Sequence, residues 1–207
     1  MKTVWDNVDK FEEIIAEYTG SKYAIAIDSC TNALFLSLKY CKDVYQYKNE
    51  HVNVPEKTYI SVPMQVKHAG FEVSFTNTQW QGAYKLDPLP VIDSAQRFTK
   101  GMYIPDTLYC ISFHFKKILS TGRGGMILTD DKDAYEWFRA MRYDGRPSIF
   151  YNDIIDMGVN YLGYHMYMSP EQAVMGINNF YNVNGDNKDS GCSDNYAVDL
   201  SKLNCFR

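Results

Sequence analysis

Two adjacent lysines, Lys116 and Lys117, stand in the stretch SFHFKKILSTGRGG (residues 112–125), which begins with the end of a short apolar segment. A lysine amine held in a desolvated pocket is a nucleophile that forms Schiff bases with carbonyl compounds. A single lysine is more often a solvated surface residue. The two lysines therefore indicate carbonyl chemistry only if other residues of the chain could form a binding site together with one of them.

Three other places carry side chains suited to the same chemistry. Asp93 ends the apolar run LPVID, where a carboxylate needs a partner unless it caps a turn or a helix. Ser29 and Thr31 stand at the start of a predicted helix, and the free N–H groups of a helix N-terminus attract phosphate. Tyr59, in KTYIS, is suited to stack on a planar ring, although an aromatic residue there also suits the core. None of these signals identifies a function alone.

Alternating strands and helices must position these residues. Short apolar runs predict strands at residues 23–27, 51–55, 72–76, 89–93, 108–114 and 125–130. Helical spacing and capping residues predict helices that include residues 11–18, 31–41, 58–69, 133–143 and 169–180. This alternation predicts an α/β fold with three layers, α/β/α, around a mostly parallel sheet.

The polar candidates fall where predicted strands end. Ser29–Thr31 follow one strand, Asp93–Gln96 another and Ser112–Lys117 a third. Because ligands bind at the carboxyl ends of the strands in such sheets, we expect these segments to meet at one edge. The domain is predicted to cover residues 1–181. The polar segment 182–207 has little periodicity, so we expect it to be poorly ordered or loosely attached.

The composition argues against several other classes of protein. The 207 residues are 45% hydrophobic and carry a net charge of −4, which suits one globular domain and not a nucleic-acid-binding surface. We expect neither a membrane span nor a signal peptide, because no apolar run has the required length and flanks. Five cysteines without a CxxC pair predict reduced thiols and a cytoplasmic location. Four histidines without ligand-like spacing predict no metal site.

Several motifs follow one another in the order of a known enzyme family. FEEIIAEYTGSKYAIAIDSCTNALFLSLK resembles the opening of the DegT/DnrJ/StrS sugar aminotransferases, and PVIDSAQRF is similar to their VI-(E)-D-A-A-[HQ] segment. SFHFKKILSTGRGGMILTDD resembles the family's SFHPTKNLTTGEGGAVVTDD, and GYHMYMSPEQAVMG resembles its GYNFRMSELQAALG. The likeness covers residues 8–178. It implies the large domain of a pyridoxal 5′-phosphate (PLP) enzyme of the aspartate-aminotransferase fold, with the family's C-terminal small domain lacking.

The resemblance implies a role for each candidate near the cofactor ring. Lys117 falls on the family's Schiff-base lysine, which is also its general base and acid, and Lys116 is then a solvated neighbour. Asp93 falls on the aspartate that pairs with the protonated pyridine nitrogen. Gln96 falls on the residue that contacts the ring hydroxyl, and Tyr59 on the aromatic residue that stacks on the ring.

The resemblance also implies a phosphate site and a second subunit. Ser29, Cys30 and Thr31 fall on the phosphate-binding turn, and Ser112 falls on a further phosphate ligand. His165 falls where the family has an asparagine that reaches the phosphate of the neighbouring subunit. We therefore expect a homodimer.

The implied activity is the transfer of an amino group from an amino acid, usually glutamate in this family, to a nucleotide-linked keto-sugar for surface polysaccharide. Such an enzyme has small-molecule substrates and needs neither nucleic acid nor a membrane. Two alternatives stay open. Dehydratase relatives carry histidine in place of the lysine that Lys117 matches. A degenerate, non-catalytic binding protein would account for the altered SCTN turn and the missing second domain.

Overall fold

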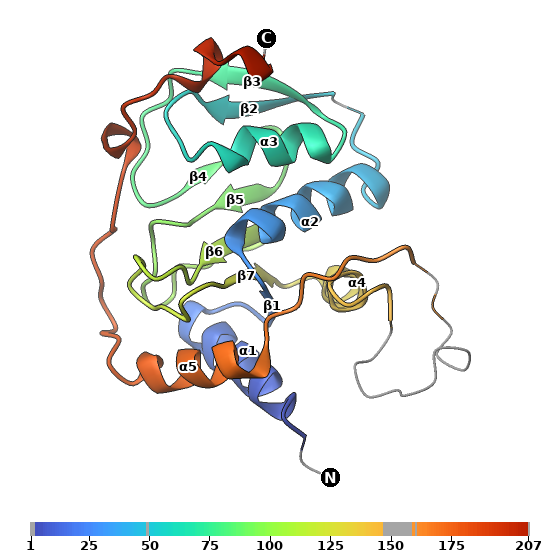
Figure 1. Ribbon diagram of the computed structural model, residues 1–207, viewed down its shortest axis with the longest axis vertical. Helices are drawn as coiled ribbons and strands as arrows, with labels where there is room; N and C mark the ends of the chain where they lie inside the picture. Colours follow the sequence, from blue (N-terminus) through green and yellow to red (C-terminus); the bar gives the residue numbers. More distant parts are fainter. Residues whose placement is uncertain (1–2, 49, 147–158, 160, 207) are drawn as a thin grey trace.

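The computed structural model describes residues 3–48, 50–146, 159 and 161–206. A five-stranded mixed sheet has the strand order β1-β7-β6-β5-β4, and β2 and β3 form a separate parallel pair (Figure 1). The strands are β1 (Tyr23–Ile27), β2 (His51–Pro55), β3 (Glu72–Thr76), β4 (Tyr84–Lys85), β5 (Val91–Asp93), β6 (Leu108–Ser112) and β7 (Gly125–Thr129). The helices are α1 (Asp6–Thr19), α2 (Cys30–Asp43), α3 (Ser61–His68), α4 (Lys132–Met141) and α5 (Pro170–Phe180), with the 3-10 helices η1 (Ser193–Asn195), η2 (Leu200–Lys202) and η3 (Asn204–Phe206).

Helices cover both faces of the larger sheet, so the predicted α/β/α layering is confirmed. α1 and α5 lie on one face, and α2 and α4 lie on the other (Figure 1). Successive residues of a strand point to opposite faces of the sheet, and in β1 both faces are covered by helices. Ile25 and Ile27 pack in the cluster with α2 and α4, whereas Ala24 and Ala26 pack in the cluster with α1 and α5.

The prediction of a mostly parallel sheet is wrong, because the larger sheet is mixed. β5 and β6 are parallel, whereas β1 with β7, β6 with β7 and β4 with β5 are antiparallel. A parallel neighbour needs a crossover connection, usually a helix. The loop after β6 instead folds back on itself, since Phe113 N donates to Gly124 O (2.9 Å) and Phe115 N donates to Gly122 O (3.0 Å). β1, β5 and β6 still run in the same direction, and β7 and β4 run in the other.

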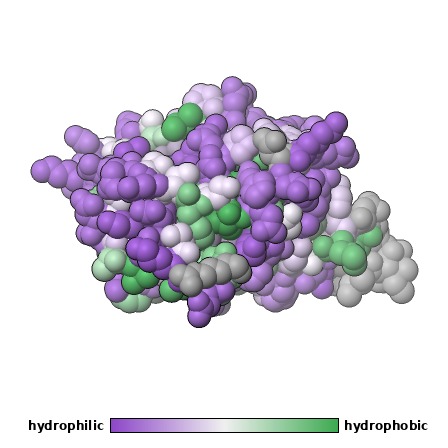
Figure 2. Space-filling model, turned by 90° about the horizontal axis from the view of Figure 1, so that it is seen from above, coloured by the Kyte–Doolittle hydropathy of each residue, from purple (hydrophilic) through white to green (hydrophobic). Residues whose placement is uncertain are grey.

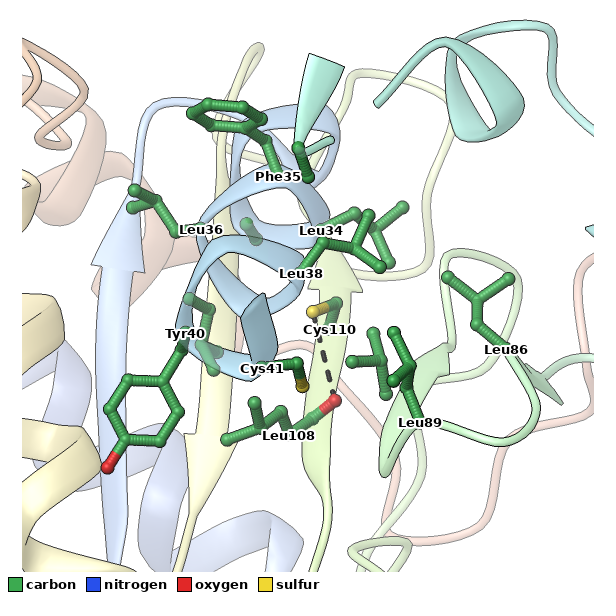
Figure 3. Close-up of a cluster of buried hydrophobic side chains, with 14 of the residues drawn as sticks. Leu34, Phe35, Leu36, Leu38, Tyr40, Cys41, Leu86, Leu89, Leu108 and Cys110 are labelled. Carbon is green, nitrogen blue, oxygen red and sulfur yellow. Dashed lines mark hydrogen bonds between the residues drawn. The ribbon is translucent and has the colours of Figure 1, made fainter. Parts of the chain in front are cut away.

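The core beneath the site is formed where α2 packs on the sheet. The helix begins at Cys30 because Ser29 is its N-cap, with Oγ accepting from Asn32 N. One face of this helix packs on the sheet: Leu34 and Leu38 are buried and lie close to the sheet strand that carries Leu108 and Cys110 (Figure 3). This contact fixes the N-terminus of α2 at the carboxyl end of β1.

The segment after α5 differs from the expected loose tail. Residues 182–206, here called the C-terminal strap, run from α5 along one edge of the molecule to β3 (Figure 1). Leu200 and Ser193 are 3% and 2% exposed, and Phe206 packs against Phe75 of β3. The polar side chains that suggested disorder are used instead for hydrogen bonds to the domain, as with Asn187, whose Nδ2 donates to Phe98 O (3.0 Å).

The surface is mainly polar. Figure 2 shows the face seen from above in Figure 1 to be mostly hydrophilic, with apolar residues near its centre and at a few places along its margin. Single exposed apolar residues are normal on folded proteins. Among the helices of the described residues, none has the length and hydropathy needed to cross a bilayer.

Candidate active site

The strand ends bring the three predicted segments to one edge of the sheet. Gly125 at the start of β7 is paired with Ile27 at the end of β1 and with Ser112 at the end of β6. Asp93 at the end of β5 is paired with Cys110 of β6. The same edge of the sheet therefore carries all three segments, Ser29–Thr31, Asp93–Gln96 and Ser112–Lys117. This agrees with the expectation that residues after strands of the same direction meet at one edge.

The two lysines have different surroundings. Lys117 is half-buried and its Nζ donates to Gln96 Oε1 (3.0 Å), whereas Lys116 is exposed and lies over the ring of Phe115. Burial lowers the pKa of Lys117, and the charge of Lys116 lowers it further, while the charge of Asp93 opposes this shift. A lowered pKa leaves more of the amine neutral and nucleophilic at a given pH.

Asp93 is a buried carboxylate with neutral hydrogen-bond donors. Only 5% of the residue is exposed, Oδ2 accepts from the Tyr84 hydroxyl (2.7 Å) and Oδ1 accepts from Ala95 N (3.0 Å). Burial raises the pKa of Asp93, and these two hydrogen bonds and the charge of Lys117 act in the opposite direction. The hydrogen bond from Ala95 N is the contact expected if Asp93 only caps a turn. The Tyr84 contact and the deep burial go beyond a turn, and they suit a carboxylate that receives a cation.

Sequence analysis did not identify Tyr84, whose hydrogen bond orients Asp93. Its hydroxyl also shares a hydrogen bond with Thr58, next to Tyr59. Tyr84 lies on β4, which has two residues only. A strand of that length has no periodicity, so only the three-dimensional structure identifies this contact.

The predicted phosphate turn opens helix α2. Cys30 is the first helical residue, and it is absent from the described residues with positive φ, so its side chain causes no backbone strain. Thr31 Oγ1 and Ser61 Oγ share a hydrogen bond (3.0 Å). The N-terminus of a helix of 14 residues presents free N–H groups and a partial positive charge to an anion.

Gly125 sets the position of this turn. A Cβ at Gly125 would lie 2.3 Å from Cys30 N and 2.4 Å from the carbonyl carbon of Ser29. Both are backbone atoms, so neither can rotate away, and only glycine allows β7 to pass this close beneath the turn.

We predict that Gly125→Ala lowers the free energy of unfolding by about 1–3 kcal/mol, because the methyl group must displace the backbone of the turn. Urea unfolding measures the change. Gly185→Ala is the matched control, since a Cβ at Gly185 has no atom within 4 Å. Equal stability of the two variants would show that β7 does not constrain the turn.

Among the hydrogen bonds of the described residues, none joins the three further predicted residues Tyr59, Ser112 and His165 to Lys117 or Gln96. Tyr59 is 58% exposed, which excludes the core alternative and leaves its ring free to stack. Ser112 Oγ accepts a long hydrogen bond from His114 N (3.4 Å). His165 Nδ1 lies 3.2 Å from Asp144, and in the part of the chain that the structure describes its ring contacts Tyr143 and Tyr167 rather than Lys117.

Two residues of the C-terminal strap join the site without having been predicted. Ser190 Oγ donates to Gln96 Oε1 (2.9 Å), and Gln96 Nε2 donates to Tyr196 Oη (3.1 Å). A cavity of about 460 Å³ shares Trp80 and Tyr84 with these surroundings but is not lined by Lys117 or Gln96. Within the described residues, no cluster of three or more His, Cys, Asp or Glu side chains is arranged to hold a metal ion.

Comparisons with known proteins agree with the motif order. The model of the DegT/DnrJ/EryC1/StrS aminotransferase family matches residues 1–104 and 105–189. The spore coat polysaccharide biosynthesis protein SpsC of Bacillus subtilis (strain 168) is 25% identical over 82% of this chain and 55% of its own length. A UDP-4-amino-4,6-dideoxy-N-acetyl-β-L-altrosamine transaminase of Campylobacter jejuni is 22% identical over 83% of this chain and 55% of its own length.

A solved structure shares the fold. GDP-4-keto-6-deoxy-D-mannose-3-dehydratase of E. coli, with bound hydrated PLP, superposes with a TM-score of 0.66 at 15% identity. The match covers 84% of this chain and 60% of that one. The chain spans about half the length of the curated relatives it matches.

Proposed function

Because the chain belongs to the DegT/DnrJ/EryC1/StrS aminotransferase family, we propose that it is a PLP-dependent sugar aminotransferase. The amino donor is an amino acid, with glutamate as the first candidate, and the acceptor is a nucleotide-linked keto-sugar. The observation that carries the proposal is the half-buried Lys117 amine on Gln96, at the sheet edge where Asp93 is buried.

The side chains at this edge fit the functional groups of PLP. Lys117 is a nucleophile for the aldehyde, and Asp93 has a buried carboxylate for the protonated ring nitrogen. Gln96 would hold the ring oxygen, and the exposed ring of Tyr59 would cover one face. The N-terminus of α2, at Ser29–Thr31, would hold the phosphate.

The chain's own residues supply positioning and proton transfer. When bound, PLP supplies an aldehyde that condenses with amines and a ring that withdraws electrons from the substrate. Lys117 would attach the cofactor and, once released by the amino donor, would move a proton between the substrate carbon and the carbon that carries the cofactor's aldehyde. Asp93 would keep the ring nitrogen protonated, and its hydrogen bond from Tyr84 holds the carboxylate in place for this.

The two alternatives, a dehydratase and a non-catalytic binding protein, make different demands on the residues of the site. The dehydratase alternative requires histidine where this chain has Lys117. The non-catalytic alternative does not require Lys117, Asp93, Gln96 and Tyr59 to be retained together. The retained set favours transamination.

Incubation of the PLP-treated protein with glutamate tests the proposal. We expect formation of 2-oxoglutarate together with loss of the absorption band of lysine-bound PLP, and then amination of a keto-sugar nucleotide added second. Binding of PLP without any 2-oxoglutarate from glutamate or another amino acid would contradict transamination and favour the binding-protein alternative.

We also propose a homodimer in the cytoplasm. The side chain of His165 is 67% exposed, so its ring is accessible to a second subunit. All five cysteines are unpaired, which agrees with a reducing compartment. Light scattering distinguishes a dimer from a monomer, and a monomer would contradict a role for His165 across subunits.

A further inference from the structure

The C-terminal strap is held against the edge of the domain at several points. Its first residues lie against α1, where Asn184 O accepts from the Tyr18 hydroxyl (2.6 Å). Its middle forms a bidentate ion pair, in which Asp189 accepts from Arg97 Nε and Nη2, both at 2.8 Å. Its last part lies at the β2–β3 pair, where Leu200 N donates to Glu56 O (2.8 Å).

Two glycines let the strap approach closely. A Cβ at Gly82 would lie 2.3 Å from the carboxyl carbon of Asp189, and a Cβ at Gly191 would lie 3.0 Å from the amide carbon of Gln96. Gly82 N also donates to Gly191 O (2.9 Å). The strap is therefore fitted to this surface rather than resting loosely on it.

The strap occupies two of the four hydrogen-bonding positions of the Gln96 side chain, one on Oε1 and one on Nε2. A glutamine amide has two acceptor lone pairs and two N–H donors. Oε1 accepts from Lys117 Nζ and from Ser190 Oγ, and Nε2 donates to the phenol oxygen of Tyr196. The phenol thus takes one of the two amide N–H groups that the proposed function assigns to the ring oxygen of PLP.

The Tyr196 ring packs against Trp80, next to its hydrogen bond with Gln96. Its centroid is 5.7 Å from that of Trp80, which is 8% exposed. Burial raises the pKa of Tyr196, the hydrogen bond from Gln96 acts in the opposite direction, and the charge of Asp93 raises the pKa further, so the phenol is neutral at neutral pH. Gln96 is one of the groups proposed to hold the cofactor ring.

We propose that the C-terminal strap is a closing segment that competes with PLP for Gln96, so that the strap must move away from Gln96 before PLP binds. This inference rests on the proposed function of the Lys117 site. Apparent affinity falls in proportion to the fraction of molecules whose site is open.

A reversible disulfide tests the proposal directly. Gln81 and Cys192 are partners in an antiparallel bridge, so their side chains point to the same face at a spacing that suits a disulfide. In Gln81→Cys with Cys205→Ser, oxidation locks the strap and a phosphine reductant releases it. Cys205 is replaced because it is an exposed free thiol. We expect the rate of PLP uptake, followed by the absorption of lysine-bound PLP, to be about tenfold or more lower in the locked form.

The outcomes separate this inference from the proposed function. Equal uptake by the locked and released forms would overturn the inference and leave the proposed function standing. No uptake by the locked form, the released form or the Cys205→Ser parent would overturn the proposed function, and the inference with it.

A second variant removes only the competing oxygen. Tyr196→Phe is expected to raise the apparent PLP affinity about threefold, which corresponds to one hydrogen bond of ordinary strength. Tyr181→Phe, at a tyrosine that is 77% exposed, is the matched control and should leave the affinity unchanged. Weaker PLP binding by Tyr196→Phe would overturn the inference, because it would mean that the phenol holds the cofactor rather than competing with it.

Discussion

Lys117→Ala is expected to remove covalent PLP binding and to lower transamination by a factor of about 10⁴ or more, since one side chain is both nucleophile and proton carrier. The loss is measured as the absence of the lysine-bound PLP band and of 2-oxoglutarate. Lys116→Ala is the matched control, because Lys116 is its exposed neighbour. Retention of the band in Lys117→Ala, or its loss in Lys116→Ala, would contradict the assignment.

The pH dependence of the wild type gives a further check on Lys117. Only the neutral amine attacks the aldehyde, so the rate of PLP attachment rises as pH rises through the pKa of the lysine. Burial lowers this pKa, so we expect the rise at a lower pH than for an exposed lysine. A rate that rises only where exposed lysines titrate would show that Lys117 is solvated.

Asp93→Asn is expected to lower activity by about 10²–10³-fold, because an amide does not stabilise a protonated ring nitrogen as a carboxylate does. The same variant should be more stable than the wild type without PLP at neutral pH. Burial raises the pKa of Asp93 above its unfolded value, so the native state binds more protons between those two values and loses stability as pH rises through that window. The asparagine side chain has no proton to lose, so Asp93→Asn keeps its stability as pH rises.

Thermal unfolding without PLP, at neutral pH and near pH 4, measures the expected gain in stability of Asp93→Asn. The gain in Tm of Asp93→Asn should shrink at the lower pH, where the wild-type carboxyl is more protonated. Asp43→Asn is the control, because Asp43 is exposed and pairs with Lys39. A lower Tm for Asp93→Asn than for the wild type at neutral pH would show that the ionised carboxylate stabilises the fold.

The sequence predicted where the strands end better than how they pair. Short apolar runs followed by polar residues located the strand ends, so the meeting of Ser29, Asp93 and Ser112 at one edge followed from general rules. The direction of β7 did not follow, because a buried strand has the same pattern in either direction. The loop after β6 is long enough for a crossover, and only its internal hydrogen bonds show that it folds back.

Composition was misleading for the C-terminal strap. Asn, Asp and Ser lower hydrophobicity and break periodicity, and both features are typical of disorder. Here the same side chains bind backbone groups and Arg97, as Asn187 and Asp189 do, and such contacts leave no repeating pattern in a sequence. Of the two lysines, only the resemblance to a family distinguished Lys117 from Lys116 before the structure did.

The position of the strap in the chain has a consequence for biosynthesis. Ser29, Asp93 and Lys117 all leave the ribosome well before Tyr196, and chains fold from their N-terminal parts during synthesis. If the strap closes the site as proposed, a nascent chain presents the site uncovered until Tyr196 has been synthesised. We infer that cofactor capture is easiest during translation, and that a chain completed without PLP must reopen to acquire it.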